Sequence, residues 1–425
     1  MTKQKMGLTT KIMIGLVAGM VTGIILYNFP AGVLRDTIII DGLFQLVGQL
    51  FLRAILMMVV PLVFVSLVNG SASMGDVKKL GRIGVRTVLF YLVTTAVAIS
   101  IALGLASIVQ PGVGLDLSEI VTREPSINEG VPLVEVLIDM IPRNPIAAMS
   151  SGNMLQIIVF AVFMGVGLSA LGEKVKPIVS LFDQLNDLMM KMVGYVMLLA
   201  PYGVFALIAR TFANEGFDVM IPLLKYMGTV ITALIIHAVI TYGGLLKGFT
   251  GLNPVRFFKK FLPAFSVAFS TASSGATLPV TMETVEERIG VSKNIASFTL
   301  PLGATINMDG TAIMQGAATI FIAQVYGIEL TFAAIMTVIL TATLASIGTA
   351  GVPGVGLIML SMVLQSVGLP VEGIALIMGI DRLLDMSRTA INITGDAVCT
   401  AIIAKAEGEF DQSIFDADDT KTTTV

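Results

Sequence analysis

The sequence has little charge: Asp, Glu, Lys and Arg make up 13% of its 425 residues, whereas a soluble domain carries roughly 25%. It has no tryptophan, one cysteine and one histidine, which excludes a disulfide scaffold and a zinc-type His/Cys cluster. The net charge of -3 lacks the basic excess of a nucleic-acid binder, so we expect no nucleic-acid partner. Hydrophobic residues instead make up 55% of the chain, and the mean hydropathy is +0.90. This length accommodates about eight to ten spanning helices of ~20 residues, which predicts a polytopic, all-α membrane protein.

Apolar segments alternate with short polar loops, and the first segment shows no cleavage site of a signal peptide. The segments lie at 12–29, 38–69, 84–109, 153–171, 177–212 and 219–246. Lysine and arginine cluster after the second, fourth and sixth segments, whereas five acidic residues follow the third. The positive-inside rule therefore places both termini in the cytoplasm, and we expect a polar, mobile tail at 407–425.

The second half of the chain contains a pair of interrupted apolar stretches. Residues 254–290 surround the small-residue run 270–279, and residues 331–369 surround the Gly-rich run 345–356. Each part is too short to span a bilayer, and non-helical backbone at membrane depth needs protein or water around it. Paired interruptions of this kind are typical of transporters built from inverted repeats. Two kinked helices or two ordinary loops are the alternative interpretation.

Ionisable residues interrupt two apolar helices near the C-terminus. Asn307 and Asp309 lie in one of them, where Gly310 weakens the helix and exposes carbonyl groups to a cation. In the last helix, at about 100° per residue, six polar residues share an arc of about 100°: Asp381, Asp385, Arg388, Thr389, Asn392 and Asp396. Such residues are costly at membrane depth and need compensation.

Two interpretations of this polar stripe compete. In a structural one, Arg388 pairs with Asp385, and the other carboxylates form buried ion pairs that fix the helix register. In a functional one, the excess of carboxylates over Arg388 binds a charged solute and cations, which we favour. Tyr91, Thr94 and Thr95 share a helix face, but alone such groups are more typical of helix–helix hydrogen bonds. His237, in an apolar run, fits a structural role better than a proton relay.

At these residues the sequence resembles the dicarboxylate/amino acid:cation symporter family. The motifs are Asn307-Met-Asp-Gly-Thr311, 348–354 (GTAGVPG) and 385–396 (DMSRTAINITGD), and the resemblance covers nearly the whole chain. It implies a homotrimer in a bacterial or archaeal plasma (inner) membrane. Each protomer would have eight transmembrane helices and two re-entrant hairpins and would work as an elevator. The implied division is scaffold helices at 8–70 and 151–215, an extracellular loop at 113–150, and a transport unit at 78–112 and 216–406, followed by the tail at 407–425.

The resemblance also implies roles for individual residues. For the substrate, Arg388 would bind a side-chain carboxylate and Asp385 the α-ammonium group, with the remaining contacts from Thr389, Asn392, Thr311, Ser274, Val352 and Gly356. A first Na⁺ site would use Asp396, Asn307 and Asn392, and Gly303 is counted among the cation ligands without assignment to one site. A second would use Asp309, Asn307, Tyr91, Thr94 and Thr95. A third would combine Thr305 with Ser346, Ile347 and Thr349.

The first hairpin departs from the family pattern. The order Ala272-Ser-Ser-Gly-Ala276 replaces the usual serine run, and an arginine found just before it in archaeal members is absent, for which Arg382 is a candidate substitute.

We expect a symporter of L-aspartate and/or L-glutamate coupled to Na⁺, with membrane lipid as its surroundings. Proton coupling and C4-dicarboxylate transport remain alternatives within the family, although Asp385 suits an ammonium group. An anion channel is the alternative from another class. The sequence shows no nucleophile–base pair and no phosphate-binding loop, so we do not expect an enzyme.

Overall fold

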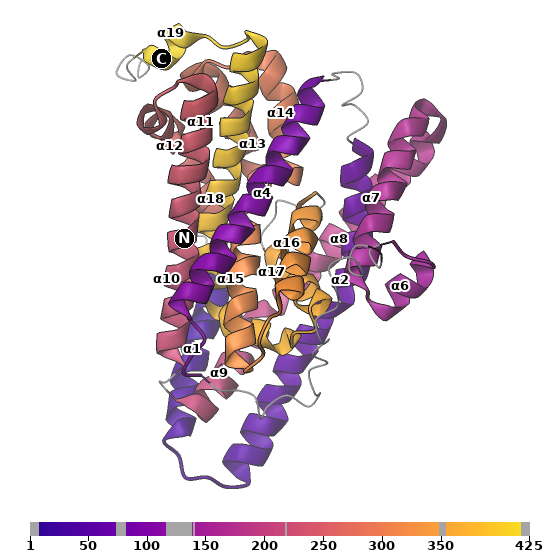
Figure 1. Cartoon of the computed structure of the whole chain (residues 1–425). Helices are drawn as coiled ribbons and strands as arrows, with labels where there is room; N and C mark the ends of the chain where they lie inside the picture. The colour runs from indigo at the N-terminus through magenta and orange to yellow at the C-terminus, as the bar shows by residue number, and fades with distance from the viewer. Residues whose placement is uncertain are drawn as a thin grey trace, which may run out of the picture.

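The computed structural model describes residues 8–73, 82–115, 138, 141–216, 219–347 and 354–417. In these ranges the chain is helical (Figure 1). Its one pairing of extended backbone there is the antiparallel bridge between Val291 and Phe410. Among them, 5 helical stretches are long and apolar enough to cross a membrane: Thr10–Tyr27, Leu34–Asn69, Ile83–Val109, Gln156–Leu198 and Met220–Thr250. The prediction of an all-helical, multi-pass membrane protein is confirmed, whereas the count of eight spans stays a prediction.

The helices of the first half pack mainly on one another. They are α1 (Leu8–Tyr27), η1 (Leu34–Phe44), α2 (Gln45–Ser73), α6 (Pro145–Ser151), α7 (Met154–Leu171), η4 (Gly172–Val175), α8 (Lys176–Leu198) and α9 (Ala200–Glu215). Helix α1 lies along α9, and α2 contacts α7, α8 and α9. A Cβ atom on Gly19 of α1 would stand only 2.6 Å from the Phe205 carbonyl oxygen of α9. Glycines four residues apart therefore allow the close helix contact typical of membrane proteins.

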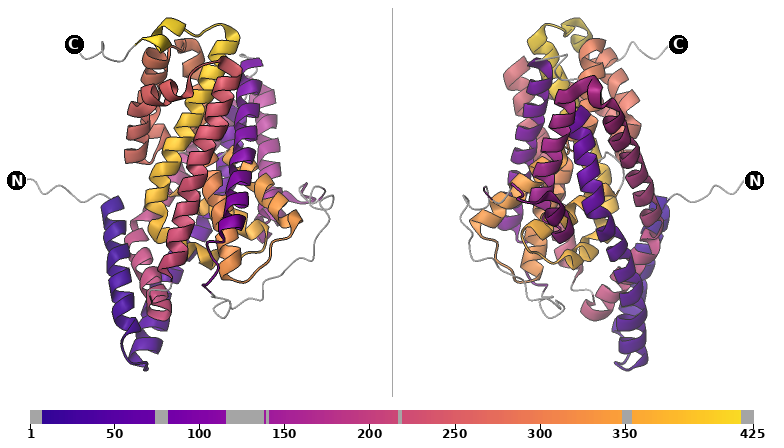
Figure 2. Two further views of the ribbon diagram at one scale, coloured as in Figure 1. Left: turned by 60° about the vertical axis from the view of Figure 1, so that its left-hand side comes forward. Right: turned by 90° about the vertical axis from the view of Figure 1, so that its right-hand side faces the viewer.

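A second group of helices forms around α15 (Asp309–Val325). It contains α4 (Arg82–Val109), α10 (Met220–Ile236), η5 (His237–Tyr242), α11 (Gly243–Thr250), α12 (Pro254–Thr271), α13 (Ser274–Thr284), η6 (Val285–Ile289), α14 (Lys293–Ile306), α16 (Phe332–Ser346), α17 (Val355–Ser366), η7 (Val371–Gly373), α18 (Ile374–Glu407) and α19 (Gln412–Asp416). Helix α4 comes from the first half of the chain but packs on α10, α15 and α16. Figure 2 shows α4 beside these later helices.

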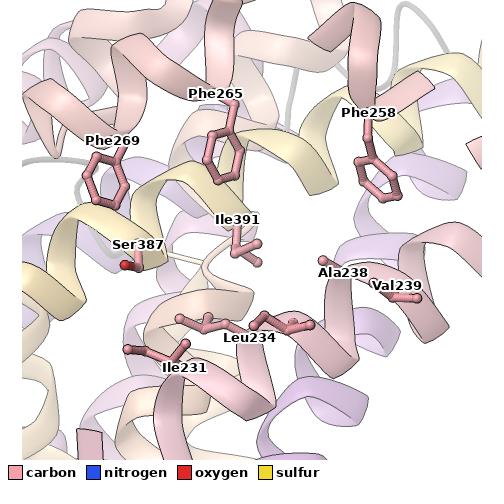
Figure 3. Close-up of a pocket in the computed structure, with 10 residues that line it drawn as sticks. Ile231, Leu234, Ala238, Val239, Phe258, Phe265, Phe269, Ser387 and Ile391 are labelled. Carbon is pink, nitrogen blue, oxygen red and sulfur yellow. The ribbon is translucent and has the colours of Figure 1, made fainter. Parts of the chain in front are cut away.

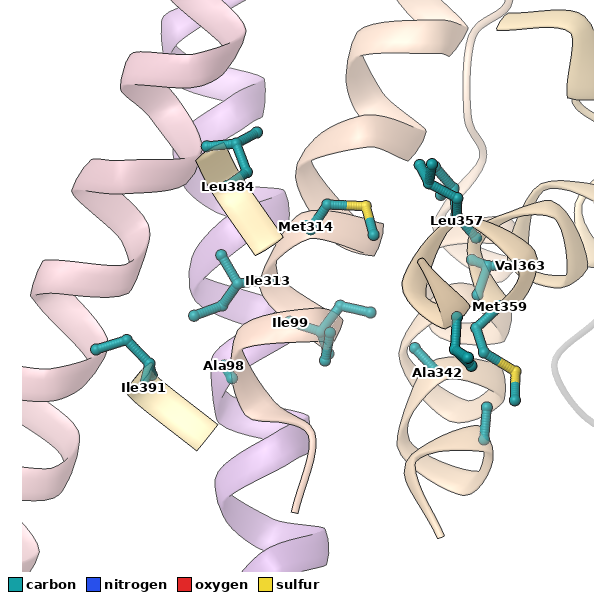
Figure 4. Close-up of a cluster of buried hydrophobic side chains, with 14 of the residues drawn as sticks. Ala98, Ile99, Ile313, Met314, Ala342, Leu357, Met359, Val363, Leu384 and Ile391 are labelled. Carbon is teal, nitrogen blue, oxygen red and sulfur yellow. The ribbon is translucent and has the colours of Figure 1, made fainter. Parts of the chain in front are cut away.

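Apolar packing fills the space between α15 and its neighbours. Almost every residue of α15 is buried, and Figure 4 shows Ile313 and Met314 of this helix near Ile99 of α4, with Leu357 of α17 on the far side of Ile99. A helix that is apolar on all sides and buried on all sides belongs to a core rather than to a lipid-facing surface. The polar residues at the N-terminus of α15 therefore lie at the centre of the second group.

The interrupted stretches form a pair of helical hairpins. Helices α12 and α13 pack on each other around a turn at Ala272, which has a positive φ of 50°, and Ser273 caps α13 by accepting a hydrogen bond from Ala276 N at 3.2 Å. Helices α16 and α17 also contact each other, with 15 and 12 residues. All four arms are shorter than a typical span of ~20 residues. The tip at 348–353 lies outside the described residues, and re-entry into the membrane stays a prediction.

The prediction that the whole tail after α18 is mobile is wrong for residues 409–417, which pack against the rest of the protein. Phe415 is 1% exposed, and backbone hydrogen bonds join Asp411 N to Gly290 O and Ser292 N to Glu409 O. Lys260 of α12 is 3% exposed, and its Nζ donates to the carbonyl oxygens of Ile414 and Ala417 at 3.1 and 2.9 Å. One buried aromatic ring and these backbone contacts hold residues 409–417 against the first hairpin, although the composition there is polar.

Candidate functional site

A break between two helices brings polar backbone to the centre of the second group. Helix α14 ends at Ile306 and α15 begins at Asp309, because Asn307 and Met308 have non-helical backbone angles. Gly310 N donates a 2.7 Å hydrogen bond to Asn392 Oδ1 of α18. A Cβ atom on Gly310 would lie 2.6 Å from the Arg388 carbonyl oxygen, so only glycine allows α15 this close to α18. The sequence predicted a helix weakened at Gly310, whereas the break lies at Asn307 and Met308 and Gly310 itself belongs to α15.

Arg388 is the largest charged group of the site. It is 0% exposed, and it donates from Nη1 to Asp381 Oδ1 at 2.8 Å and from Nη2 to Asp385 Oδ1 at 2.9 Å. Arg382 Nη1 lies 3.6 Å from the other oxygen of Asp385. Two arginines thus face two aspartates on a single helix. The pair of Arg388 with Asp385 that the structural interpretation predicted is present, and Asp381 joins it as a second partner.

The guanidinium group of Arg388 is enclosed by other elements but retains one donor. A Cβ atom on Gly356 in α17 would lie 3.4 Å from Arg388 Nη2 and 3.6 Å from Thr311 Cγ2 of α15. The second hairpin therefore lies against the arginine, and the substrate contacts predicted for Gly356 and Thr311 stay a prediction. Within the described residues, Arg388 Nε has no hydrogen-bond partner although it is buried. A buried donor of this kind is costly unless a ligand or water accepts its hydrogen bond.

Asp396 and two asparagines form a second cluster next to the helix break. Asn307 Nδ2 donates to Asp396 Oδ1 and to the Asn392 carbonyl oxygen, both at 2.8 Å. In the described part of the chain, Asn307 Oδ1 is buried without a hydrogen-bond donor. A Cβ atom on Gly303 would lie 2.5 Å from Asp396 Oδ1 and 2.6 Å from Tyr91 Oη. The structure thus brings together Asp396, Asn307 and Asn392, which were predicted to share a site, and places Gly303 beside them. The cluster has an unsatisfied oxygen of the type that a hard cation prefers.

Asp309 lies in a third cluster and is bound by side chains from two other elements. Thr95 Oγ1 of α4 donates to Oδ1 at 2.5 Å, and Tyr242 Oη of η5 donates to Oδ2 at 2.8 Å. His237 Nε2 lies 3.0 Å from the same Oδ2, and both side chains of this pair are 0% exposed. Thr95 therefore lies beside Asp309, and its part in a Na⁺ site stays a prediction. Tyr91 Oη instead donates to the Thr299 carbonyl oxygen at 3.3 Å.

For the remaining predicted site residues, no described contact joins the side chain to a side chain of the three clusters. Thr94 and Thr305 donate to backbone oxygens of their own helices, as do Ser346 and Thr389, whose acceptor is the Asp385 carbonyl oxygen. Ser274 is buried at the start of α13, and Ile347 is buried after α16. Thr349 and Val352 lie outside the described residues.

The sequence did not predict that His237 and Tyr242 both contact Asp309 Oδ2, because the two residues lie in a π-helix and not in an α-helix. Residues five apart in an α-helix point about 140° away from each other. Residues 237–242 form a π-helix, in which the hydrogen bonds join residues five apart and bring such pairs to one side. The two rings are 4.5 Å apart and both reach Asp309. A lone histidine and a tyrosine in one apolar run were the available signal.

Comparisons with known proteins agree with this geometry. The sequence model of the sodium:dicarboxylate symporter family matches residues 8–406. The chain belongs to that family. It is 38% identical over 416 residues to the "proton/sodium-glutamate symport protein" of Bacillus caldotenax, covering 96% of both chains.

Two further relatives are named for different solutes. One is the "proton/glutamate-aspartate symporter" of Escherichia coli K12, 39% identical over 96% of this chain and 94% of the relative. The other is a "C4-dicarboxylate transport protein" of Bacillus subtilis, 35% identical over 86% of this chain and 88% of the relative. Membership of a symporter family confirms the predicted resemblance and agrees with the prediction that the protein is not an enzyme. The solute and coupling ion of this symporter are not decided by membership, because the relatives differ in both.

Proposed function

We propose that the protein is a secondary active symporter that imports L-aspartate and/or L-glutamate together with Na⁺. The observation that carries the proposal is the fully buried Arg388, held between Asp381 and Asp385 on the same helix. An arginine buried in a membrane protein needs a carboxylate partner, and its planar fork suits bidentate binding of one. An acidic solute meets that need in the substrate-bound protein.

In this proposal, Arg388 exchanges Asp385 for a substrate carboxylate while it keeps Asp381, which explains why both aspartates are needed. A substrate carboxylate that binds Arg388 takes the place of Asp385, whose carboxylate is then available for the α-ammonium group of the same substrate. The charge inside the site stays nearly balanced, because the substrate brings one ammonium and two carboxylates, while Asp381 remains on Arg388. A C4-dicarboxylate would leave Asp385 without its cation, which disfavours that solute.

The other two aspartates support coupling to a cation. Among the described residues, the hydrogen-bond partners of Asp309 and Asp396 are a threonine, a tyrosine, an asparagine and His237, and none of them is an arginine or a lysine. Two buried carboxylates without a permanent cation must be compensated by a bound ion or a proton. The unsatisfied oxygen of Asn307 and the close backbone at Gly303 suit Na⁺ at Asp396. Asp309 with Thr95 would hold a second ion, and Thr305, Ser346, Ile347 and Thr349 a third.

The two packing groups support an elevator mechanism within a homotrimer. Helices α1, α2, α7, α8 and α9 would form the fixed scaffold in the inner membrane, with both termini in the cytoplasm. Helix α4 and the helices from α10 onward would move as the transport unit. All three polar clusters lie within this second group, so the substrate and its ions would cross the membrane together.

Proton coupling is the second candidate, because His237 touches Asp309 and two of the relatives carry "proton" in their names. A His–Asp pair can hold a proton at the place where Na⁺ would otherwise compensate Asp309. The site for the acidic solute is the same in both versions.

Uptake by purified protein in liposomes tests the proposal. Radiolabelled aspartate should accumulate against its gradient when Na⁺ is higher outside, and the accumulation should stop when the Na⁺ gradient is collapsed by an ionophore. Unlabelled glutamate should compete, whereas succinate and serine should not. Accumulation driven only by a pH gradient would select the proton version. Flux that never exceeds equilibrium would contradict symport and indicate an anion channel.

A further inference from the structure

An apolar groove opens between α10–η5 and α12, away from the three polar clusters. It has a volume of about 310 Å³, at the lower end of the ~300–1,000 Å³ range of ligand pockets. Figure 3 shows Phe258, Phe265 and Phe269 of α12 pointing across it towards Ile231 and Leu234 of α10. Ile391 of α18 lies between the two walls.

The lining of the groove excludes a polar ligand. Ser387 is its one polar side chain, and that hydroxyl already donates to the Leu383 carbonyl oxygen at 3.1 Å. Water or an amino acid in the groove would find no hydrogen-bond partner there, so the occupant has to be apolar. A flexible hydrocarbon chain has no hydrogen-bonding groups, so it can pack between the three phenylalanine rings and the aliphatic side chains of the groove without losing hydrogen bonds.

The position of the groove indicates where such a chain comes from. One wall belongs to the candidate membrane span Met220–Thr250, and two of its residues, Ile235 and Val239, are 58% and 60% exposed. In a membrane protein, apolar side chains exposed along a span face the hydrocarbon of the bilayer. The groove therefore opens towards lipid and not towards water.

One end of the groove is closed, and a free positive charge lies beside it. Ideal Cβ geometry at Gly243 places Pro254 and Phe258 within 4.0 Å, so the walls meet where α12 begins. Lys259 follows Phe258 and is exposed, and in the described residues its ammonium group has no ion-pair partner. Lys259 also belongs to the cluster of basic residues after the sixth apolar segment, which the positive-inside rule places in the cytoplasm. An anionic headgroup beside Lys259 would extend its acyl chain along the groove.

We propose that this groove is a binding site for one acyl chain of an anionic bilayer phospholipid, with its headgroup at Lys259. The chain packs against Ser387 and Ile391, which flank Arg388 and Asn392 on α18. The lipid thus supports the rear of the polar stripe and separates the first hairpin from α10. Binding of the lipid is independent of the proposed solute and coupling ion.

The absence of tryptophan makes a direct test possible. Phe265→Trp and Ile235→Trp each place a single tryptophan on opposite walls of the groove, and the exposed Ile235 tolerates the change if Phe265 does not. Ile240→Trp is the matched control, because Ile240 is 66% exposed on η5 but does not line the groove. The full-length variants are reconstituted in vesicles with increasing fractions of phosphatidylglycerol brominated on its acyl chains, which quenches nearby tryptophan.

We expect half-maximal quenching of the groove tryptophans at a several-fold lower fraction of brominated lipid than for Ile240→Trp. Adding Ala238→Phe, which fills the groove, should remove the difference. Brominated phosphatidylcholine should quench less strongly, and Lys259→Gln should abolish this headgroup preference. Identical curves for groove and control would mean general contact with lipid and would overturn the proposal. Unquenched groove tryptophans beside a quenched control would also overturn it and would indicate that protein covers the groove.

Discussion

Two buried charged regions of the same helix bundle differ in how their charges are compensated. Around Arg388, two arginines face two aspartates, and each charge has an opposite charge within 3.6 Å. Around Asp309 and Asp396, the described donors are hydroxyl, amide and imidazole groups. In the described residues, the first region is complete without a ligand except for two guanidinium donors, Arg382 Nε and Arg388 Nε. The second region carries two carboxylates that have no arginine or lysine among their described partners.

This difference assigns different tasks to the two regions. Balanced ion pairs can exchange partners with a zwitterionic acidic solute at little net electrostatic cost. Uncompensated carboxylates attract a small cation or a proton, and the arrival of either lowers the cost of burying the whole cluster. Gly310 links the regions, because it follows Asp309 in α15 and lies against α18, where an added Cβ atom would be 2.6 Å from the Arg388 carbonyl oxygen. Binding in one region can therefore change affinity in the other, and the coupling must be reciprocal.

The largest effect is expected from breaking the balanced region with Arg388→Cys. Loss of a bidentate charge-assisted pair in a desolvated site costs several kcal/mol, so aspartate affinity should fall over a hundredfold, or about 3 kcal/mol. Asp385 remains to bind an ammonium group, so uptake of serine or alanine should appear. Radiolabelled uptake of the three solutes in liposomes measures both changes, and the gain of serine uptake also proves that the variant folds. An unchanged aspartate affinity would contradict the role of Arg388.

The next largest effect is expected from neutralising the unbalanced region. Asp396→Asn and Asp309→Asn keep the shape of the side chain but remove the charge that attracts the ion. We expect each change to flatten or abolish the increase of aspartate affinity with Na⁺ concentration, while the Arg388 ion pairs stay intact. Calorimetric titration of aspartate at several Na⁺ concentrations is the measurement. If the unmodified protein responds to pH but not to Na⁺, the sodium assignment is wrong and these carboxylates carry protons.

A finer comparison uses the two side chains that reach Asp309 Oδ2. Tyr242→Phe and His237→Gln each remove or change one hydrogen bond to that oxygen, worth roughly 1 kcal/mol or about fivefold in affinity. If Asp309 binds Na⁺, both variants should weaken the apparent Na⁺ affinity to a similar extent. If the cluster carries a proton, only His237→Gln should flatten the pH dependence of uptake. Uptake measured from pH 5 to 8 at fixed Na⁺, with Tyr242→Phe as the matched control, separates the two.

The smallest effect on aspartate affinity is expected from Arg382→Gln, at the edge of the balanced region around Arg388. Arg382 lies 3.6 Å from Asp385 with 16% of its side chain exposed, and exposed or long ion pairs are worth ~0–1 kcal/mol. Arg382→Gln should therefore lower aspartate affinity less than about fivefold, far less than Arg388→Cys does. Competition of aspartate with its labelled form gives the ratio. A loss as large as that of Arg388→Cys would show that Arg382 binds the substrate, as its proposed substitution for the missing hairpin arginine implies.

The sequence predicted the parts that depend on local periodicity. The polar stripe of α18 follows from 3.6 residues per turn, and the structure places all its members on one buried side, with Arg388 against two of them. The hairpins follow from small residues and proline at two interruptions. The break before Asp309 was not predicted at its place, because the glycine that indicated a weakened helix lies inside α15. The tail was predicted less well, because one phenylalanine in a polar segment gives no signal of the surface that it packs on.

What the sequence alone determined is the kind of protein and the side chains available to it, because hydropathy selects a bilayer and helical spacing aligns charges on a face. The tertiary structure decided which groups meet. Asp309 is bound by Thr95, His237 and Tyr242, which are 214, 72 and 67 residues away in the chain. No helical period extends over such distances, and only the packing of α4 and the π-helix against α15 brings these side chains to one carboxylate.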